Sequence, residues 1–355
     1  GAILLGTENV GKLLSKYAIP AIIAMTASSL YNMVDSIFIG QGVGPLAISG
    51  LAITFPFMNL GAAIGAMVGV GASTVTAMEL GKKNYAKSCR ALSNTVMLNV
   101  FFGIIFTIVC LIFLKPILFF FGASENTLPY AYEYMQVILL GNIITHLYHG
   151  LNSVLRASGH PNEAMIATII TVIANIFLDW LFIYPLDMGI RGAAIATVIA
   201  QTLPLIYLFK IFLNKNEIVH FDKNDFVFDI KIIKDILAIG LSPFLLNTAL
   251  CVIIILINNG LKKFGGDLSV GAYGIVNRVT FFFTMIVMGI TQGMQPIVSY
   301  NYGARQYSRV TEALKKAILL AFLTLTIGFI IGETIPRFVC SFFTADEELL
   351  NYSID

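Results

Sequence analysis

LYNMVDSIFIG, residues 30–40, and ANIFLDWLFIY, residues 174–184, each place one carboxylate inside an apolar run of membrane-spanning length. Asp35 and Asp179 are the only charged residues within their respective runs. A charge at such depth costs several kcal/mol unless it is paired, solvated or protonated, and intramembrane acids therefore mark functional sites by default. The two segments together indicate a helical membrane protein with a proton or cation site.

The composition supports this fold class. Of the 355 residues, 57% are hydrophobic and 12% are charged, and the mean hydropathy is +0.84. A soluble domain of this size would expose much of that apolar surface to water, whereas a bundle embedded in a bilayer keeps it in lipid. The net charge of +2 gives no reason to expect a nucleic-acid partner. The four cysteines lack CxxC spacing, so we expect them to form neither a metal site nor disulfides. We expect no cofactor, and no metal ion beyond a coupling Na⁺.

Charge-poor runs of about 20 residues or more predict nine membrane-spanning helices. We place them at residues 13–40, 46–80, 86–114, 127–157, 162–186, 190–213, 233–262, 268–302 and 308–335. A tenth helix is expected to begin near Asp346.

A polar stretch divides these helices into two groups. We predict an N-lobe of six helices at residues 1–213, a cytoplasmic linker at 214–232, and a partial C-lobe at 233–355 that holds helices 7–9 and the start of helix 10. The chain has no initiator Met and no recognisable ending after Asp355, so we expect a C-terminally truncated piece of a longer protein.

The basic residues orient the predicted bundle. With the N-terminus and every second loop on one side, that side carries 16 Lys and Arg, the other carries five, and Arg278 lies within a span. The positive-inside rule then makes the N-terminus cytoplasmic. Asp35 and Asp179 lie five or six residues before the outer ends of their helices, which is about 8–9 Å of rise. Thr197 enters from the outer side to a similar depth, so one shared site in the outer half is predicted.

The chain repeats itself at an offset of 222 residues. VGASTVTAMELGKKNYAKSCRAL (70–92) aligns with QGMQPIVSYNYGARQYSRVTEAL (292–314), with glycines matched at 71 and 293 and at 81 and 303. The offset spans six helices, so both copies cross the membrane in the same direction. Parallel repeats related by a pseudo-two-fold axis along the membrane normal build transporters with a substrate site between the halves.

Three long segments carry a resemblance to a known family. They are residues 18–56, residues 159–197 and residues 293–310, and they resemble the bacterial drug-export branch of the MATE (multidrug and toxic compound extrusion) family. The resemblance implies two pseudo-symmetric six-helix lobes, of which the second is incomplete here. It also implies export of bulky, often cationic drugs driven by inward Na⁺ or H⁺. At the positions that match the family's cation site, the resemblance implies that the cation-coupling groups are Asp35, Asn175, Asp179, Thr197 and the carbonyl of Ala193.

The chemistry of these residues suits a hard cation. Asn175 and Asp179 are four positions apart and share one helix face, as do Ala193 and Thr197. Carboxylate, amide, hydroxyl and carbonyl oxygens are ligands that hard cations prefer. Two close carboxylates also share protons readily, so the coupling ion is Na⁺ or H⁺. The alternative is that both acids only bond neighbouring helices.

A second set of residues is expected to line a substrate cleft between the lobes. Adaptable Met side chains suit promiscuous drug surfaces, although the same pattern is typical of lipid-facing or core positions. The predicted cleft residues are Asn32, Tyr148, Asn152, Asn277, Arg278, Met285, Met288, Gln292 and Gln295.

These observations predict a secondary active multidrug exporter, a cation/drug antiporter that spans the cytoplasmic membrane many times and acts as a monomer on cationic amphipathic drugs. A flippase for lipid-linked precursors is the alternative, but its cleft would need many Arg and Lys residues to hold pyrophosphate. A membrane enzyme would need a nucleophile–base set or a metal cluster, which we do not find. A channel is distinguished by its inability to move a drug uphill.

Overall fold

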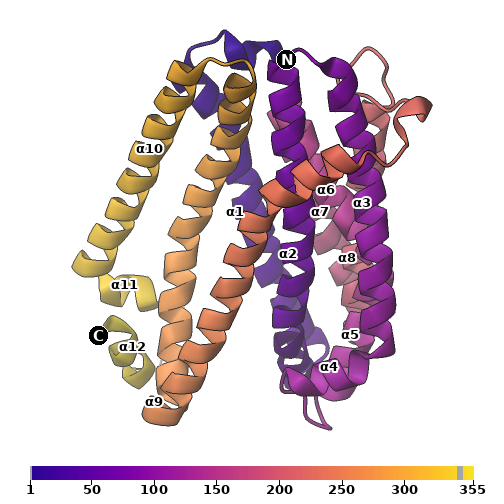
Figure 1. Cartoon of the computed structure of the whole chain (residues 1–355). Coiled ribbons are helices and arrows are strands. Elements are labelled where there is room, and N and C mark those ends of the chain that lie inside the picture. The colour runs from indigo at the N-terminus through magenta and orange to yellow at the C-terminus, as the bar shows by residue number, and fades with distance from the viewer. Residues whose placement is uncertain (1, 342–346) are drawn as a thin grey trace.

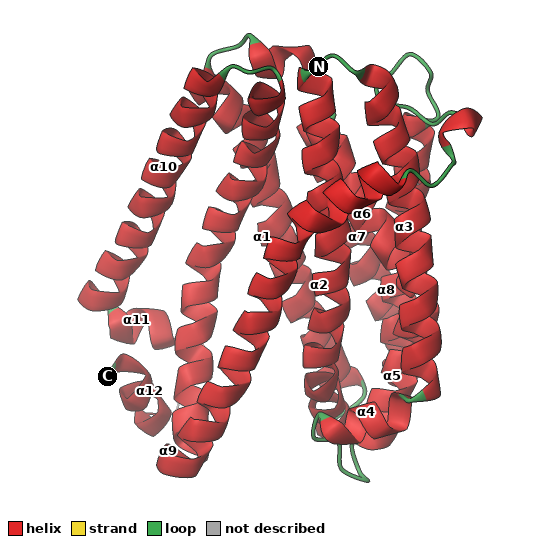
Figure 2. Cartoon of the chain, viewed as in Figure 1, coloured by secondary structure: helices red, strands yellow, loops and turns green. Residues whose placement is uncertain are grey.

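The computed structural model describes residues 2–341 and 347–355. Within α9 it does not describe the side chains of residues 254–255, 258–259, 261–262, 266–275 and 277–278, and in α12 it does not describe that of Glu348. In the described part of the chain the secondary structure consists of helices joined by loops, and it contains no strand (Figure 2).

Twelve α-helices and two short 3₁₀ helices follow one another in the described residues. The first eight are α1 (Val10–Gly42), α2 (Pro45–Gly81), α3 (Tyr85–Ile112), α4 (Leu114–Phe120), α5 (Leu128–Leu140), α6 (Asn142–Ala157), α7 (Pro161–Ile183) and α8 (Gly189–Phe212). The remaining four are α9 (Ile230–Gly303), α10 (Tyr307–Thr334), α11 (Pro336–Ser341) and α12 (Glu347–Ile354), and the 3₁₀ helices are η1 (Ala2–Gly6) and η2 (Lys223–Asp225).

Local sequence signals set the helix ends, and six predicted spans agree with the structure to within three residues. The side chain of Asn9 accepts a hydrogen bond from the amide of Lys12 at 3.3 Å, and Asn84 does the same for the amide of Lys87, so both act as N-caps. Helices α2 and α7 instead begin with proline, whose missing amide proton has no partner to lose at the first helical position.

The predicted span at 127–157 is broken in the structure. It consists of α5 and α6, which meet at Gly141. A side chain at Gly141 would overlap the isopropyl group of Val198 on α8. Glycine therefore permits the junction of α5 and α6 to approach α8 closely. The short helices α4 and α11 were not predicted, because neither is long enough to give a membrane-span signal. Asp346, where a tenth helix was expected, lies outside the described residues.

Helix α9 contains two predicted spans without a break in its helical assignment. Gly71 of α2 meets Ile236 near the start of α9, and Gly81 of α2 meets Tyr300 near its end. The two glycines are about 15 Å apart along α2, whereas a straight helix would separate Ile236 from Tyr300 by about 96 Å. Helix α9 therefore folds back into two antiparallel limbs, with its turn at the end of the bundle that also holds α4 (Figure 1). Within the described residues, eight helical segments, including both limbs, are long and apolar enough to cross a membrane.

The two halves of the chain, α1–α8 and α9–α12, meet through reciprocal glycine contacts. Gly81 packs on the carbonyl of Tyr300, and Gly303 packs on the carbonyl of Met78. Met78 and Tyr300 are themselves equivalent at the offset of 222, so each contact is the symmetry mate of the other. Reciprocal contacts of this kind are the mark of a two-fold relation between the halves.

All these contacts lie toward one end of the bundle. This end, which we name the basic end, holds the start of α1 and the loop from α2 to α3 with Lys82, Lys83 and Lys87 (Figure 1). The opposite end, which holds α4 and the turn of α9, is named the distal end.

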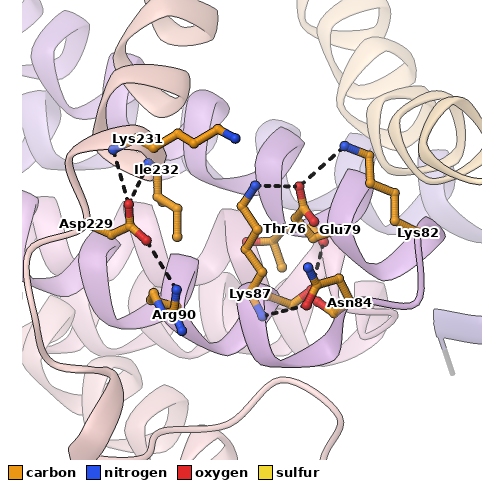
Figure 3. A network of polar contacts seen from close by, with 10 residues as sticks. Thr76, Glu79, Lys82, Asn84, Lys87, Arg90, Asp229, Lys231 and Ile232 are labelled. Atoms are coloured by element: carbon orange, nitrogen blue, oxygen red, sulfur yellow. Dashed lines mark hydrogen bonds and ion pairs between the residues drawn. The ribbon is translucent and has the colours of Figure 1, made fainter.

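The predicted linker is packed against the first half. Val219 and Phe221 are buried, and Phe221 stacks on Phe209 of α8 with ring centroids 5.5 Å apart. Asp229 caps α9 by accepting hydrogen bonds from the amides of Lys231 and Ile232, and it also pairs with Arg90 of α3 at 3.3 Å (Figure 3). The linker, which joins α8 to α9 in the chain, thus holds the start of α9 against α3.

We expect Asp229→Ala to lower the melting temperature of the protein at pH 7, because loss of an N-cap costs about 1 kcal/mol. Burial raises the pKa of Asp229, but the amide hydrogen bonds and Arg90 lower the pKa by more, so it lies below its ordinary value. The stabilisation is therefore present above the unfolded-state pKa and is lost as the pH falls through the lower folded-state pKa. The difference in melting temperature between the variant and the wild type should therefore be smaller at pH 3 than at pH 7.

Thermal unfolding in detergent at the two pH values measures this difference. Asp222→Ala is the matched control, because the exposed Asp222 caps only the three-residue η2 and has no arginine partner among the described contacts. A difference for Asp229→Ala that is independent of pH would contradict the assigned role of its carboxylate.

Candidate functional site

The two intramembrane carboxyl groups lie against each other in the structure. Helix α1 packs on α7, and this contact brings the carboxyl groups of Asp35 and Asp179 close to one another. Both are buried, with 7% and 1% of their surface exposed. Two buried carboxyl groups this close repel each other when both are ionised, so the pair favours a state that holds a proton or a cation.

The amide and hydroxyl groups predicted for the site lie beside each other on the next helix pair. The Nδ2 of Asn175 donates to the Oγ1 of Thr197 at 3.4 Å, which links α7 to α8. The Oγ1 of Thr197 in turn donates to the carbonyl of Ala193 at 3.0 Å. All three residues are buried, and the four-residue spacing on each helix places the polar groups on facing sides.

Three oxygens in this group have no hydrogen-bond partner although they are buried. They are the Oδ1 atoms of Asp35, Asn175 and Asp179. Buried oxygens are normally satisfied, and each one left without a donor carries a desolvation cost of about 1–3 kcal/mol. A cation that accepts lone pairs from all three would remove this cost, and so would additional protons or water. The donor set fits a hard cation.

Two tyrosines complete the surroundings of the site and were not predicted. Tyr31 and Tyr134 lie close to the carboxyl pair, and Tyr134 also lies close to the hydroxyl group of Thr197. Tyr31 precedes Asp35 by four residues and therefore shares its helix face, which is a signal that the sequence does contain. Tyr134 reaches the site only because Gly141 separates α5 from α6, and no local pattern indicates this.

The predicted cleft residues do not form one group in the structure. Tyr148 is buried and donates to Thr168 at 3.3 Å, and Asn152 donates to the carbonyl of Ala164 at 3.1 Å, so both engage α7 within the first half. Asn32 is exposed, as is Met288, while Met285 is half-buried. The side chains of Asn277 and Arg278 lie outside the described residues.

The glutamines of the second half lie at its contact with the first. The amide nitrogen of Gln295 donates to the carbonyl of Val70 at 3.2 Å and to the hydroxyl groups of Ser73 and Thr74 on α2. Gln292 lies one helical turn before Gln295 and lines the same small cavity between the halves. In this conformation both residues belong to the closed contact near the basic end.

Among the described residues no group of three or more His, Cys, Asp or Glu side chains has the arrangement of a metal site.

Characterised bacterial proteins are similar to this chain over most of its length. A multidrug export protein, MepA, of Staphylococcus aureus (strain MSSA476) is 27% identical over 341 residues, which are 96% of this chain and 75% of the relative. The protein of the same name from Staphylococcus haemolyticus is 27% identical over 334 residues, 93% of this chain and 74% of the relative.

Solved structures give the same result for the fold. One is described as the outward-facing conformation of a multidrug resistance MATE family transporter of the MOP superfamily. It matches with a TM-score of 0.93 at 26% sequence identity, and the match covers 99% of this chain and 79% of that one. Another, a MOP superfamily transporter from Pyrococcus furiosus, has a TM-score of 0.93 at 25% identity with coverage of 99% and 79%, and is described as having a binding pocket of reverse polarity that suggests a different function.

A family model matches the larger part of the sequence. The model described as MatE covers residues 20–181 and 238–355, which include Asp35, Asn175 and Asp179. The match, the fold and the related exporters agree with the resemblance seen in the sequence, and the chain belongs to the MatE family of membrane transporters.

Proposed function

We propose that this protein exports small-molecule drugs that are cationic and amphipathic across the cytoplasmic membrane, and that inward movement of a cation through the Asp35–Asp179 site drives the export. The observation that carries the proposal is the contact between two buried carboxyl groups whose Oδ1 atoms, like that of the neighbouring Asn175, have no hydrogen-bond donor. Such an arrangement costs free energy in the absence of a ligand, so it is typical of a site that binds and releases charge.

The site accommodates either coupling ion. In the proton form, the carboxyl pair gains or loses a proton and the flanking Asn175 and Thr197 adjust their hydrogen bonds. In the sodium form, the Oδ1 atoms of Asp35, Asn175 and Asp179 would bind the ion, with Thr197 and the Ala193 carbonyl as further oxygens. In both forms the change in charge occurs between α1, α7 and α8, so it alters how α1 packs.

The contacts between the halves indicate how that change reaches the drug. Helix α1 also packs on α9, through Ala18 against Gly293 and Ile22 against Gly289. A shift of α1 therefore acts on the contact that closes the basic end. Since the basic loops lie at this end, we place it in the cytoplasm by the positive-inside rule, and the drug would then leave toward the distal end.

The expected result is uphill movement of a cationic dye in proteoliposomes. With the protein reconstituted and a Na⁺ or a proton gradient imposed separately, at least one gradient should drive dye against its own concentration difference. An ionophore that collapses the active gradient should stop the movement. Passive equilibration of the dye alone would indicate a channel, and no dependence on either gradient would contradict the proposal.

A further inference from the structure

Arg156 is a buried positive charge without a carboxylate partner. It lies in the last turn of α6 with 9% of its surface exposed. Its Nη2 donates to the Oδ1 of Asn152 at 3.2 Å, while its Nε has no partner. None of the ion pairs found among the described residues includes Arg156. Buried arginines are nearly always paired with an acid, because an unpaired buried charge costs several kcal/mol.

The helix itself compensates part of this charge. A cation in the last turn of a helix interacts favourably with the C-terminal end of the macrodipole, typically by about 0.3–1 kcal/mol. That interaction leaves the Nε proton of Arg156 unused and is smaller than the cost of burying a guanidinium. A further ligand is therefore needed to account for the position of Arg156.

A cavity of about 30 Å³ adjoins Arg156 at the contact between the two halves. Its polar lining comes from Ser73 of α2, Ser153 and Arg156 of α6, and Gln292 and Gln295 of α9. A cavity needs roughly 10–15 Å³ to hold one water molecule, so this one accommodates one or two water-sized species. No Asp or Glu is among its lining residues.

The lining groups have an excess of free donors. The hydroxyl protons of Ser73 and Ser153 go to the carbonyls of Val70 and His149, and the amide of Gln295 is engaged by α2. The Nε proton of Arg156 remains, and no hydrogen bond among the described contacts uses the side-chain amide of Gln292. A positive charge with unused N–H groups and no acidic neighbour attracts an anion.

We propose that this cavity binds a small inorganic anion of the size of chloride, held by Arg156 from the first half of the chain and Gln292 from the second. Because groups from both halves contact the anion, it binds only while they are together at the basic end. It therefore favours this conformation over one in which the halves separate there.

The site is separate from the carboxyl pair. Arg156 ends α6 at the basic end, whereas Asp35 and Asp179 lie toward the distal ends of α1 and α7. The anion would thus be a second ligand that acts on the same conformational equilibrium from the other end of the bundle.

Thermal unfolding in detergent tests the proposal, with sodium concentration and ionic strength held constant while gluconate is replaced by chloride. A thiol-reactive dye reports unfolding, because Cys89, Cys110 and Cys340 are free and buried. Chloride should raise the melting temperature saturably, by about 2–4 °C at ten times its dissociation constant, and bromide should act similarly. Arg156→Gln should abolish the increase, and Arg191→Gln, which removes an exposed arginine at the start of α8, should retain it.

Two further measurements separate loss of the site from loss of the fold. Gln292→Leu removes only the partner from the second half. It should raise the chloride concentration that gives half of the full rise in melting temperature at least tenfold. Asp179→Asn should leave it intact, so failure of cation coupling and failure of anion binding are distinguishable. A melting temperature that does not respond to halide in the wild type, or a response that persists in both Arg156→Gln and Gln292→Leu, would show that the cavity holds only water.

Discussion

Asp179→Asn is expected to abolish cation-coupled export while leaving the protein inserted and folded. The substitution keeps the size of the side chain and its ability to accept one hydrogen bond. It removes the carboxyl group that lies against Asp35, and with it both the proton-binding group and the negative charge that would balance a bound cation. Since a ligand shifts a conformational equilibrium only through its differential affinity for the two states, loss of the cation site removes the drive altogether. We expect uphill dye movement to fall at least a hundredfold, to background.

Asp187→Asn is the matched control for this experiment. It makes the same chemical change eight residues later, at an exposed position before α8. Asp187 has a φ of 49°, in the left-handed region that asparagine tolerates at least as well as aspartate, so this variant should fold and export normally. Dye extrusion is measured in everted vesicles with equal amounts of each protein. Normal extrusion by Asp179→Asn would refute the proposed role of the carboxyl pair.

Gly240→Ala is expected to reduce export at least tenfold for a different reason. An added methyl group at Gly240 would overlap the backbone carbonyl of Met67, so α9 and α2 would have to separate at the basic end. Small residues at helix contacts in membranes allow backbones to approach closely, and this approach is lost when a side chain is added. The variant should therefore be unable to close the basic end, and a transporter that must alternate between two states would stop.

Gly332→Ala provides the comparison, because the space around Gly332 in α10 is open. Alanine favours a helix over glycine by about 1 kcal/mol, so this control should be neutral or slightly stabilising. A cysteine introduced at the buried Ser73 reports closure: labelling by an impermeant maleimide from the basic end, located by peptide mass spectrometry, should increase in Gly240→Ala only. If Gly240→Ala exported normally and left Ser73→Cys protected, the close approach would have no role in transport.

The charge pattern made the fold predictable because a bilayer imposes one simple rule. Charged residues lie at helix ends, so runs without charge have the length of a span, and the ends of α2 and α10 were predicted to within one residue. The two limbs of α9 were predicted as separate spans for the same reason. The break at Gly141 has no such signal, because the contact with Val198 that requires glycine forms only after α8 has packed.

The site was predictable to the extent that depth along a helix decides it. Asp35, Asp179 and Thr197 were placed at one level by counting residues from the helix ends, and the structure brings these side chains together. Arg156 illustrates the opposite case. It precedes a Gly-His-Pro turn and was counted among the basic residues of a loop, yet the final turn of α6 buries it. Whether a residue near a helix end meets water depends on neighbours that are distant in the sequence.

The contact between Asp35 and Asp179 has a consequence for biosynthesis. The two residues are 144 positions apart, so α1 enters the bilayer well before α7 has been made. At about 5–20 residues per second, the delay is roughly 7–30 s. During this interval Asp35 has no partner, and an unpaired aspartate opposes insertion, by about 3 kcal/mol at the centre of a span and by less at the depth of Asp35. The most apolar stretch of α1 is less apolar than that of α3, so α1 has less favourable insertion free energy with which to offset this cost. Selection on α1 therefore acts on its insertion as well as on its transport chemistry.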